Sequence, residues 1–454
     1  MPASPARLAA FEILLRVDRQ NAFASELLHS VRVEKLTPAD RRLTTELVMG
    51  VERWRSTIDS ILANHTSTPI QKLDPEVLTV LRIGCFHLGW LRVPPRAAVH
   101  ESVELVKSAR KRSASGFVNA VLRQVQTQFA SEPVYLERSP PEALAQSVES
   151  LATQFAHPLW LVERWWRHFG PATTSRICFQ NQQIPTTVIR MRSPEAEEDL
   201  REENIEISPG ALVTTARRVL AGDITQSQAL REGKIFIQDE ASQLVALLVG
   251  SGNNILDCCA APGSKTSVLA DRNPASQIIA ADLHPHRARL MQSLLRVENV
   301  SILAADAAHL PLSISFNRIL ADVPCSGTGT LGRNPEIKWR LQPGDLADLH
   351  KRQVTILRAA IRQLSAGGRL VYSTCSLEPE ENELVVHEAM KDAREYRLVP
   401  CLSELERLKS AGELAWLDLA SLTSRDFLRT LPGVHPCDGF FAALIEKTAA
   451  GPNA

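Results

Sequence analysis

The sequence predicts a multidomain protein in which an all-α bundle and a small α+β module precede an α/β domain with a doubly wound parallel sheet. Three observations support this prediction. Apolar side chains recur at helical spacing through residues 5–130. Prolines among polar residues at 131–147 are typical of a linker. From about residue 253, short apolar runs alternate with helical segments, which is typical of a parallel sheet covered on both faces.

The amino-terminal domain is expected to span residues 1–130. Segments 6–17 and 43–54 each place apolar residues three or four positions apart, as on one face of a helix. Asp74-Pro75 and Pro94-Pro95 mark starts and breaks of further helices. These signals predict a compact bundle of helices.

The rest of the chain is divided by changes in composition and pattern. The apolar runs near 186–191 and 234–238 predict strands of a small mixed module. The expected parts are a linker at 131–150, the α+β module at 151–245, the α/β domain at 246–447 and a tail at 448–454.

Charge, cysteine usage and hydropathy exclude several classes of protein. The 51 basic residues balance 51 acidic ones, although residues 1–130 hold 18 basic against 12 acidic, a mild bias compatible with RNA contact. Eight cysteines without close regular spacing argue against a disulfide framework, and the lack of a paired Cys-x-x-Cys argues against zinc. The first residues lack the continuous apolar core of a signal peptide, so none is expected, and no apolar run approaches the roughly 20 residues that span a bilayer. We expect a cytoplasmic protein without a metal. Its oligomeric state stays open, with a monomer as the default.

Four apolar runs of the α/β domain end in an acid, at Asp257, Asp282, Asp306 and Asp322. A fifth run, at 370–372, leads to Cys375. In an open parallel sheet, ligands gather at the carboxyl ends of the strands. The sequence therefore predicts that one edge of the sheet carries the functional site.

A loop of small residues after the first of these strands indicates a cofactor site. It contains neither a Gly-x-Gly-x-x-Gly fingerprint nor a phosphate loop, so a pyrophosphate is not expected. Asp282 is placed to bind ribose hydroxyls, and Asp306 to accept a hydrogen bond from an adenine amino group. A nucleoside with a small charged tail points to S-adenosyl-L-methionine. The loop residues are Cys259, Ala260, Ala261, Pro262, Gly263, Ser264 and Lys265.

Two cysteines at strand ends are candidates for the chemistry. Cys325 follows Asp322 within Asp-Val-Pro-Cys-Ser, and Cys375 lies in Ser-Thr-Cys-Ser. A lone cysteine is usually a small buried hydrophobic residue. The repeated placement, beside an acid and a cofactor loop, favours a nucleophile, a second thiol and an acid.

Six motifs of the α/β domain lie at 257–266, 322–329, 333–336, 372–376, 380–383 and 438–441. By these motifs the chain resembles the Sun-type RNA cytosine-carbon-5 methyltransferases, in particular the RsmB (Sun) branch that modifies 16S ribosomal RNA. The amino-terminal bundle is similar to the NusB-type RNA-binding fold, and the resemblance implies a Rossmann-like catalytic domain after an RRM-like module.

The resemblance also implies roles for individual residues. Cys375 matches the nucleophile of the family, and Cys325 the cysteine linked to product release. The cofactor loop, Asp282, Asp306 and Asp322 would contact the cofactor or the reacting centre. Ser264 stands where the family usually has a second glycine, which removes no reacting group.

Such chemistry requires these residue types because carbon 5 of cytosine is a poor nucleophile. Addition of a thiolate to carbon 6 makes carbon 5 enamine-like. Asp322 would act as a general acid at ring nitrogen 3. The base must leave its stack, so single-stranded or loop RNA is the expected substrate. Arg333, Lys338 and Arg340 are the predicted phosphate contacts.

Two other functions remain open at this level. A transfer RNA cytosine-carbon-5 methyltransferase would use the same chemistry. A non-catalytic RNA-binding assembly or antitermination factor would not need Cys325, Cys375 and Asp322, and cofactor binding would distinguish it.

Overall fold

The computed structural model describes residues 3–20, 22–132, 147–295, 297–391 and 393–448. These residues form two compact units. The first contains the described residues up to Ile184 together with Leu331–Leu341, and the second contains Pro185–Thr330 and the described residues from Gln342 onward. Most of the predicted linker and tail lies outside the described residues.

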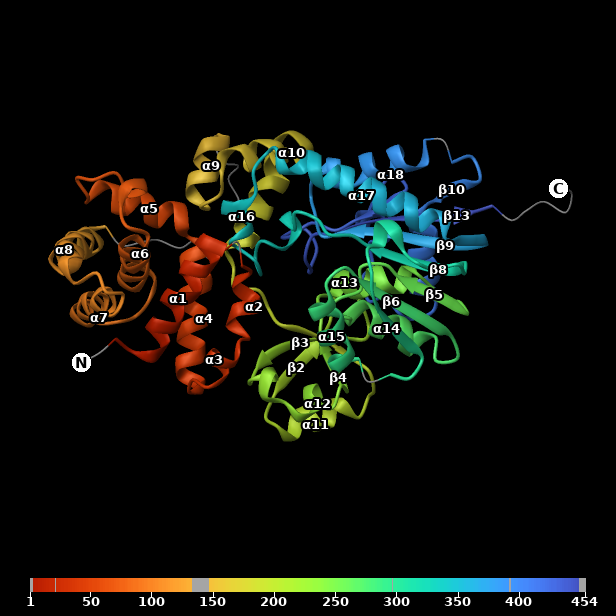
Figure 1. Ribbon diagram of the computed structural model, residues 1–454, viewed down its shortest axis with the longest axis horizontal. Coiled ribbons are helices and arrows are strands. Elements are labelled where there is room, and N and C mark those ends of the chain that lie inside the picture. The colour runs from red at the N-terminus through yellow and green to blue at the C-terminus, as the bar shows by residue number, and fades with distance from the viewer. Residues whose placement is uncertain (1–2, 21, 133–146, 296, 392, 449–454) are drawn as a thin grey trace, which may run out of the picture. The chain divides into compact units, whose positions relative to one another are not determined.

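The first unit is entirely helical in its described part, as predicted for residues 1–130. Pro75 and Pro95 occupy the first positions of α6 and α7, where a missing N–H costs nothing. Thr37 caps α4 by accepting a hydrogen bond from the backbone N–H of Asp40 at 3.1 Å. The α-helices are α1 (Pro5–Gln20), α2 (Ala24–Leu28), α3 (Val31–Glu34), α4 (Pro38–Arg53), α5 (Arg55–Asn64), α6 (Pro75–Trp90), α7 (Pro95–Ser108), α8 (Ser115–Ser131), α9 (Val148–Gln154), α10 (Leu159–Gln182) and α16 (Ile337–Arg340) (Figure 1).

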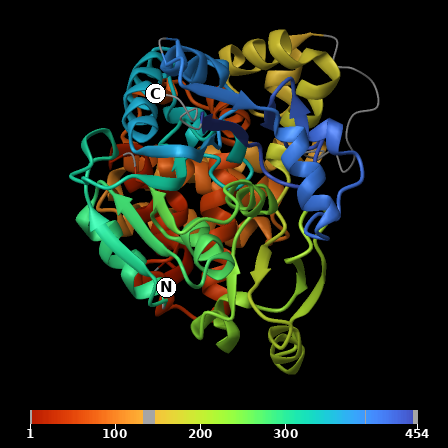
Figure 2. The ribbon, with the colours of Figure 1, turned by 90° about the vertical axis from the view of Figure 1, so that its right-hand side faces the viewer.

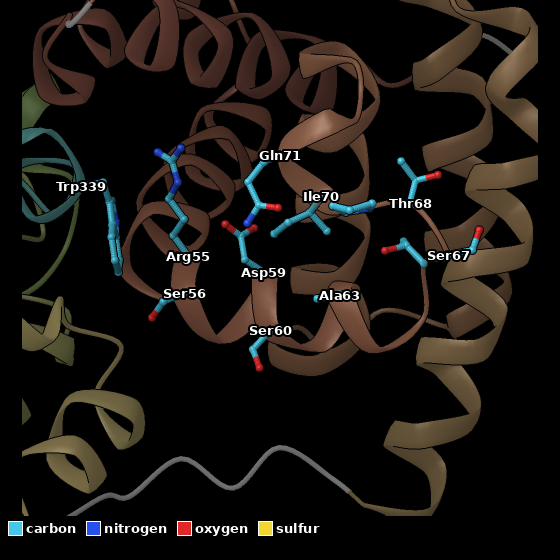
Figure 3. A pocket seen from close by; sticks show the side chains of 12 residues that line it. Arg55, Ser56, Asp59, Ser60, Ala63, Ser67, Thr68, Ile70, Gln71 and Trp339 are labelled. Carbon is cyan, nitrogen blue, oxygen red and sulfur yellow. The ribbon is translucent and has the colours of Figure 1, made fainter.

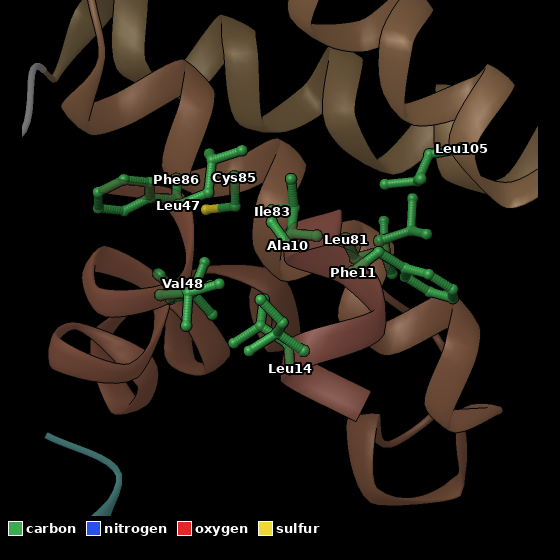
Figure 4. Packing of buried hydrophobic residues seen from close by; sticks show 14 of the residues in the cluster. Ala10, Phe11, Leu14, Leu47, Val48, Leu81, Ile83, Cys85, Phe86 and Leu105 are labelled. Atoms are coloured by element: carbon green, nitrogen blue, oxygen red, sulfur yellow. The ribbon is translucent and has the colours of Figure 1, made fainter. Parts of the chain in front are cut away.

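Helix α6 supplies much of the core of this unit. Leu81, Ile83 and Cys85 are almost completely buried, and they pack in one cluster with Leu14 of α1 and Leu47 of α4 (Figure 4). Full burial of such a leucine or isoleucine contributes about 1.5–3 kcal/mol. The bundle is therefore held by apolar contacts between helices that are distant in sequence.

The second unit begins with a small four-stranded antiparallel sheet in the order β2-β3-β1-β4. Its predicted strands are present. Helices α9 and α10, which the sequence places in the same module, belong to the first unit. The elements are β1 (Val188–Met191), α11 (Ala196–Glu202), β2 (Glu206–Pro209), β3 (Ala216–Ala221), α12 (Gln228–Arg231) and β4 (Ile235–Ile237).

The larger sheet has nine strands and a parallel centre, which confirms the predicted Rossmann-like α/β domain. The order is β11-β12-β13-β9-β8-β5-β6-β7, and β10 pairs with β13. Strands β9, β8, β5, β6 and β7 run parallel, whereas β13 is antiparallel to β9. The strands are β5 (Asn254–Asp257), β6 (Gln277–Asp282), β7 (Val300–Ala304), β8 (Phe316–Asp322), β9 (Leu364–Thr374), β10 (Tyr396–Val399), β11 (Thr423–Ser424), β12 (Phe427–Arg429) and β13 (Phe441–Lys447).

Helices cover both faces of this sheet (Figure 1; turned by 90° in Figure 2). Leu256 and Ile319 pack with α17 and α18 on one face, whereas Ile255 and Leu320 pack with α13 and α14 on the other. Alternate residues of each strand thus enter different cores, which explains the continuous apolar runs. The helices are α13 (Glu240–Leu248), α14 (Ser264–Arg272), α15 (Pro285–Leu294), α17 (Asp345–Arg362), α18 (Glu383–Met390) and α19 (Cys401–Ser410).

The strand order reverses at β5, which pairs with β6 on one side and β8 on the other. Ligands of open α/β sheets bind at such a reversal, beyond the carboxyl ends of the strands. Asp257, Asp282 and Asp322 are the last residues of β5, β6 and β8, as predicted, and Asp306 lies two residues beyond β7. None of the helices within the described ranges has both the length and the apolar character to cross a membrane.

Candidate active site

The two cysteines meet at the carboxyl edge of the sheet. Parallel pairing of β8 with β9 sets Asp322 opposite Ser373, and the loops beyond these residues bring the sulfurs of Cys325 and Cys375 to 3.3 Å. Both side chains are half-buried and free of disulfide bonds. The structure thus brings together two thiols that are 50 positions apart in sequence.

Asp322 lies beside this pair and has two close partners. Its Oδ2 is 2.7 Å from Nζ of Lys265, and its Oδ1 accepts a hydrogen bond from the Ser373 hydroxyl at 2.7 Å. Burial alone would lower the pKa of Lys265, but the attraction and hydrogen bond of Asp322 raise it above its ordinary value. The Lys265 ammonium also lies 5.2 Å from the centre of the Phe440 ring, a cation–π distance.

The environment of Cys325 disfavours its thiolate. The hydrogen bond with Cys375 raises the pKa of Cys325 well above its ordinary value, and burial and the charges of Glu381 and Asp322 raise it further. Since the thiolate is the nucleophile, this disfavours Cys325 as the attacking thiol.

Two glycines allow the cysteine loops to approach closely. The N–H of Gly329 donates to the carbonyl of Cys375 at 2.8 Å, and the N–H of Gly439 donates to the carbonyl of Gly329 at 2.8 Å. A Cβ on Gly329 would lie 2.7 Å from the carbonyl carbon of Gly439 and 2.8 Å from the carbonyl oxygen of Cys375. Only glycine fits this contact without displacing backbone.

The predicted cofactor loop connects β5 to α14. Within this loop, the backbone N–H of Ala260 donates a hydrogen bond to the carbonyl of Ala281 at 2.8 Å, which fixes the loop against β6. Gly263 precedes α14 with φ of 106°, and a Cβ there would lie 3.0 Å from atoms of Leu295 and Met291. Ser264 is the first residue of α14 and does not cap it, because the capping position belongs to Gly263.

Asp257 and Cys259 flank the start of this loop. Asp257 is 1% exposed, and burial raises its pKa to about 7, although the Thr266 hydroxyl donates to its Oδ2 at 2.7 Å and opposes the shift. Burial also raises the pKa of Cys259 well above its ordinary value. Neither group resembles an activated nucleophile.

Asp282 and Asp306 follow neighbouring parallel strands. Asp282 is buried; its Oδ1 accepts from the N–H of His284 at 2.9 Å, and its Oδ2 lies 3.8 Å from a guanidinium nitrogen of Arg287. Asp306 is exposed and accepts from the N–H of Ala308 at 2.9 Å. Each carboxylate therefore retains acceptor capacity for a ligand hydroxyl or amino group.

The predicted phosphate contacts differ from one another, and Lys338 requires a correction. It is 1% exposed, and its Nζ donates to the backbone carbonyls of Arg53 and Ala156, each at 2.9 Å. Burial lowers its pKa well below the ordinary value. Lys338 therefore holds the first unit together instead of facing RNA.

Arg333 and Arg340 are half-buried in the same unit. Arg340 donates to the carbonyl of Ala22 at 3.2 Å, and its guanidinium lies 4.4 Å from the centre of the Phe23 ring. Its role as a phosphate contact stays a prediction, as does that of Arg333.

Sequence reasoning did not foresee two contacts of the site. It expected Lys265 to contact the cofactor or the reacting centre and named no ion pair with Asp322, which the structure shows. It also gave no role to Glu381, which accepts hydrogen bonds from Ser326 and Ser376, the residues directly after the two cysteines. The available signals were the recurrence of serine after each cysteine and the motif at 380–383.

A separate groove of about 640 Å³ lies in the first unit, between α5 and the segment 66–71, with Trp339 on its wall (Figure 3). It contains one cation, Arg55, and one carboxylate, Asp59. Because no cysteine lines it, we do not assign the reaction to it. Over the part of the chain that is described, no three His, Cys, Asp or Glu side chains are grouped to hold a metal ion.

Comparison with known proteins assigns the family. The model of the family described as 16S rRNA methyltransferase RsmB/F matches residues 244–446, and that of the NusB family matches residues 4–127. A probable ribosomal RNA small subunit methyltransferase B of Bacillus subtilis (strain 168) is 32% identical, covering 98% of this chain and 100% of the relative. The chain belongs to the RsmB/F family.

Other similarities agree with this family. A probable ribosomal RNA small subunit methyltransferase B of Synechocystis sp. (strain ATCC 27184 / PCC 6803 / Kazusa) is 33% identical, covering 97% of this chain and 99% of the relative. The crystal structure of PH0851 has a TM-score of 0.79 at 22% identity, covering 98% of this chain and all of that one, and so shows the same fold. The chain is thus an RsmB/F methyltransferase with a NusB-type amino-terminal domain.

Proposed function

We propose that this RsmB/F protein methylates carbon 5 of a cytosine in 16S rRNA, with S-adenosyl-L-methionine as methyl donor and a covalent bond between Cys375 and carbon 6 of the base. The pair of thiols 3.3 Å apart, beside the Lys265–Asp322 pair, carries this proposal. A methyltransferase without a covalent step has no need of two thiols at the same strand edge.

Different residues of the site take different steps of the proposed reaction. The Cys375 sulfur adds to carbon 6, and ring nitrogen 3 takes a proton through Asp322. Lys265, 2.7 Å from Asp322, carries the proton that passes through this carboxylate. After methylation, carbon 5 gives its proton to water, the carbon–sulfur bond breaks with its electron pair returning to the Cys375 sulfur, and nitrogen 3 returns its proton to Asp322. Cys325 assists this release, because it lies next to the leaving sulfur.

The loop of residues 258–263 with Asp282 and Asp306 fits a nucleoside cofactor. Small side chains and the positive φ of Gly263 keep the backbone accessible, and the two carboxylates offer acceptors on neighbouring strands. When bound there, S-adenosyl-L-methionine supplies an electrophilic methyl group on a sulfonium sulfur. Buried Asp257 accepts a hydrogen bond from the Thr266 hydroxyl and so supports the loop between these two residues.

The proposed substrate is 16S rRNA in a single-stranded or looped segment, since the base must leave its stack to meet Cys375. The names of the relatives and of the matching family support this substrate. The NusB-type unit is the proposed RNA-binding element.

The covalent step is tested by replacing each cysteine and incubating the protein with RNA and donor. Cys375→Ala is expected to abolish methylation, and Cys325→Ala to retain a protein–RNA adduct that survives denaturation. Cys401→Ala, which removes a buried thiol from α19, is the control and should behave as the unchanged protein. Adducts formed by Cys375→Ala would reverse the assignment.

The substrate is tested by bisulfite mapping of total RNA from cells with and without the gene. Loss of one unconverted cytosine in 16S rRNA is the expected result. Loss in a transfer RNA would instead support the transfer RNA enzyme, and an unchanged map would overturn the proposed methylation.

A further inference from the structure

Glu381 is a buried carboxylate that contacts both cysteine loops. It ends the short turn Pro379–Glu381 and is 0% exposed. Its Oε1 accepts from the N–H of Ser326 at 2.8 Å, and its Oε2 accepts from the hydroxyls of Ser326 and Ser376. Since these serines directly follow Cys325 and Cys375, one side chain ties the two loops together.

Two further side chains fix this carboxylate. The amide of Gln353 on α17 donates both to Oε1 of Glu381 and to the carbonyl of Pro324, each at 2.9 Å. The hydroxyl of Tyr372 on β9 donates to the backbone carbonyl of Glu381 at 2.6 Å. The turn that bears Cys325 is therefore held on both sides of the cysteine.

A carboxylate suits this position because it only accepts hydrogen bonds. The two carboxylate oxygens of Glu381 accept four hydrogen bonds, all from uncharged donors. A buried charge is costly unless hydrogen bonds replace its hydration. An amide would present an NH₂ group where one oxygen now accepts, and the shorter Asp would not reach both loops.

The two cysteines depend on this contact unequally. Cys375 directly follows the end of β9, and its carbonyl accepts from Gly329. The Cys325 turn has less regular support, since Ser326 supplies two of the bonds to Glu381 and Pro324 is held through Gln353. Loss of Glu381 would therefore displace Cys325 more than Cys375.

We propose that Glu381 is a positioning residue that sets the separation of the Cys325 and Cys375 sulfurs, and so controls release of the methylated product from Cys375; this rests on the proposed covalent mechanism. Attack on carbon 6 requires Cys375 alone. Release requires a second thiol next to the adduct. The charges of Glu381 and Asp322 also raise the pKa of Cys325.

The test compares Glu381→Gln and Glu381→Ala with Cys325→Ala, measuring adduct formation and adduct decay separately on RNA substrate. A displacement of about 1 Å costs about 100-fold in rate. We expect Glu381→Ala to slow decay by about that factor while adduct formation falls less, and Glu381→Gln to be intermediate. Glu404→Gln removes another buried carboxylate of the same unit, on α19, and should change neither rate.

A double variant separates positioning from a general loss of structure. In the Cys325→Ala background, Glu381→Gln should add no further slowing of decay, because both changes act on one step. An additive effect, or normal decay in folded Glu381 variants, would overturn the proposal. Absence of any adduct in Cys325→Ala would instead overturn the covalent mechanism itself, so the two failures are distinguishable.

Discussion

Gly329→Ala probes the close approach of the two cysteine loops. The added Cβ would overlap the carbonyl oxygen of Gly439 and lie 2.7 Å from its carbonyl carbon, whereas ordinary contacts begin at 3.4 Å, so the backbones must separate by more than about 0.7 Å. The same shift stretches the hydrogen bonds from Gly329 to Cys375 and from Gly439 to Gly329. Each bond is worth about 1 kcal/mol.

The expected consequence is a loss of both rate and stability. A displacement near 1 Å at reacting groups costs about 100-fold, so we expect adduct formation to fall by about 10- to 100-fold. The unfolding free energy should fall by about 2 kcal/mol or more, because the overlap with the Gly439 carbonyl adds to the weakening of two hydrogen bonds. Single-turnover adduct formation and urea unfolding measure the two effects.

Gly344→Ala is the matched control, because no atom lies within 4 Å of a Cβ at that position and its φ is −68°. It should leave both rate and stability unchanged within error. A normal rate of adduct formation in Gly329→Ala would refute the view that this contact positions Cys375.

Three further predictions follow from buried charges. Asp257→Asn removes a group whose pKa rises from 3.8 to about 7 on burial. The folded state binds this proton more tightly than the unfolded state, so the unfolding free energy of the wild type falls by up to about 1.4 kcal/mol per pH unit between these two pKa values. The difference in unfolding free energy between variant and wild type, measured with urea, should therefore grow up to pH 7 and then stay constant. A difference that does not depend on pH would contradict this. Asp322→Asn keeps an oxygen that accepts the hydrogen bond from Ser373 but should slow adduct formation about 10²- to 10⁴-fold. An unchanged single-turnover rate would exclude Asp322 as the general acid. Lys338→Ala removes the donor to the carbonyl of Ala156 and one of two donors to the carbonyl of Arg53, and should cost about 1–3 kcal/mol; weaker RNA binding at unchanged thermal stability would restore the phosphate role.

The fold was predictable because its signals are local. Periodic apolar residues identify the bundle, and the strands preceding Asp257, Asp282 and Asp322 end where the apolar runs end. The position of Cys375 just beyond β9 follows in the same way. Chain connectivity alone then directs these side chains to one edge of a parallel sheet.

Long-range contacts were not predictable from such signals. Lys338 is basic and follows a loop, which suggested a phosphate contact, yet its ammonium bonds to carbonyls 285 and 182 positions away. The boundary of the middle module also depends on packing, since α9 and α10 belong with the first unit. Periodicity carries no information about which distant surfaces meet.

Local patterns are enough to place two thiols, a series of acids and a loop of small residues at the reacting edge. How these groups pair depends on the folded arrangement. The register of β8 against β9 brings Cys325 to Cys375, and packing of α14 brings Lys265 to Asp322. Glu381 then joins the loops from a separate turn. These arrangements arise from contacts between segments far apart in sequence, whose energies depend on burial and geometry that no local pattern records.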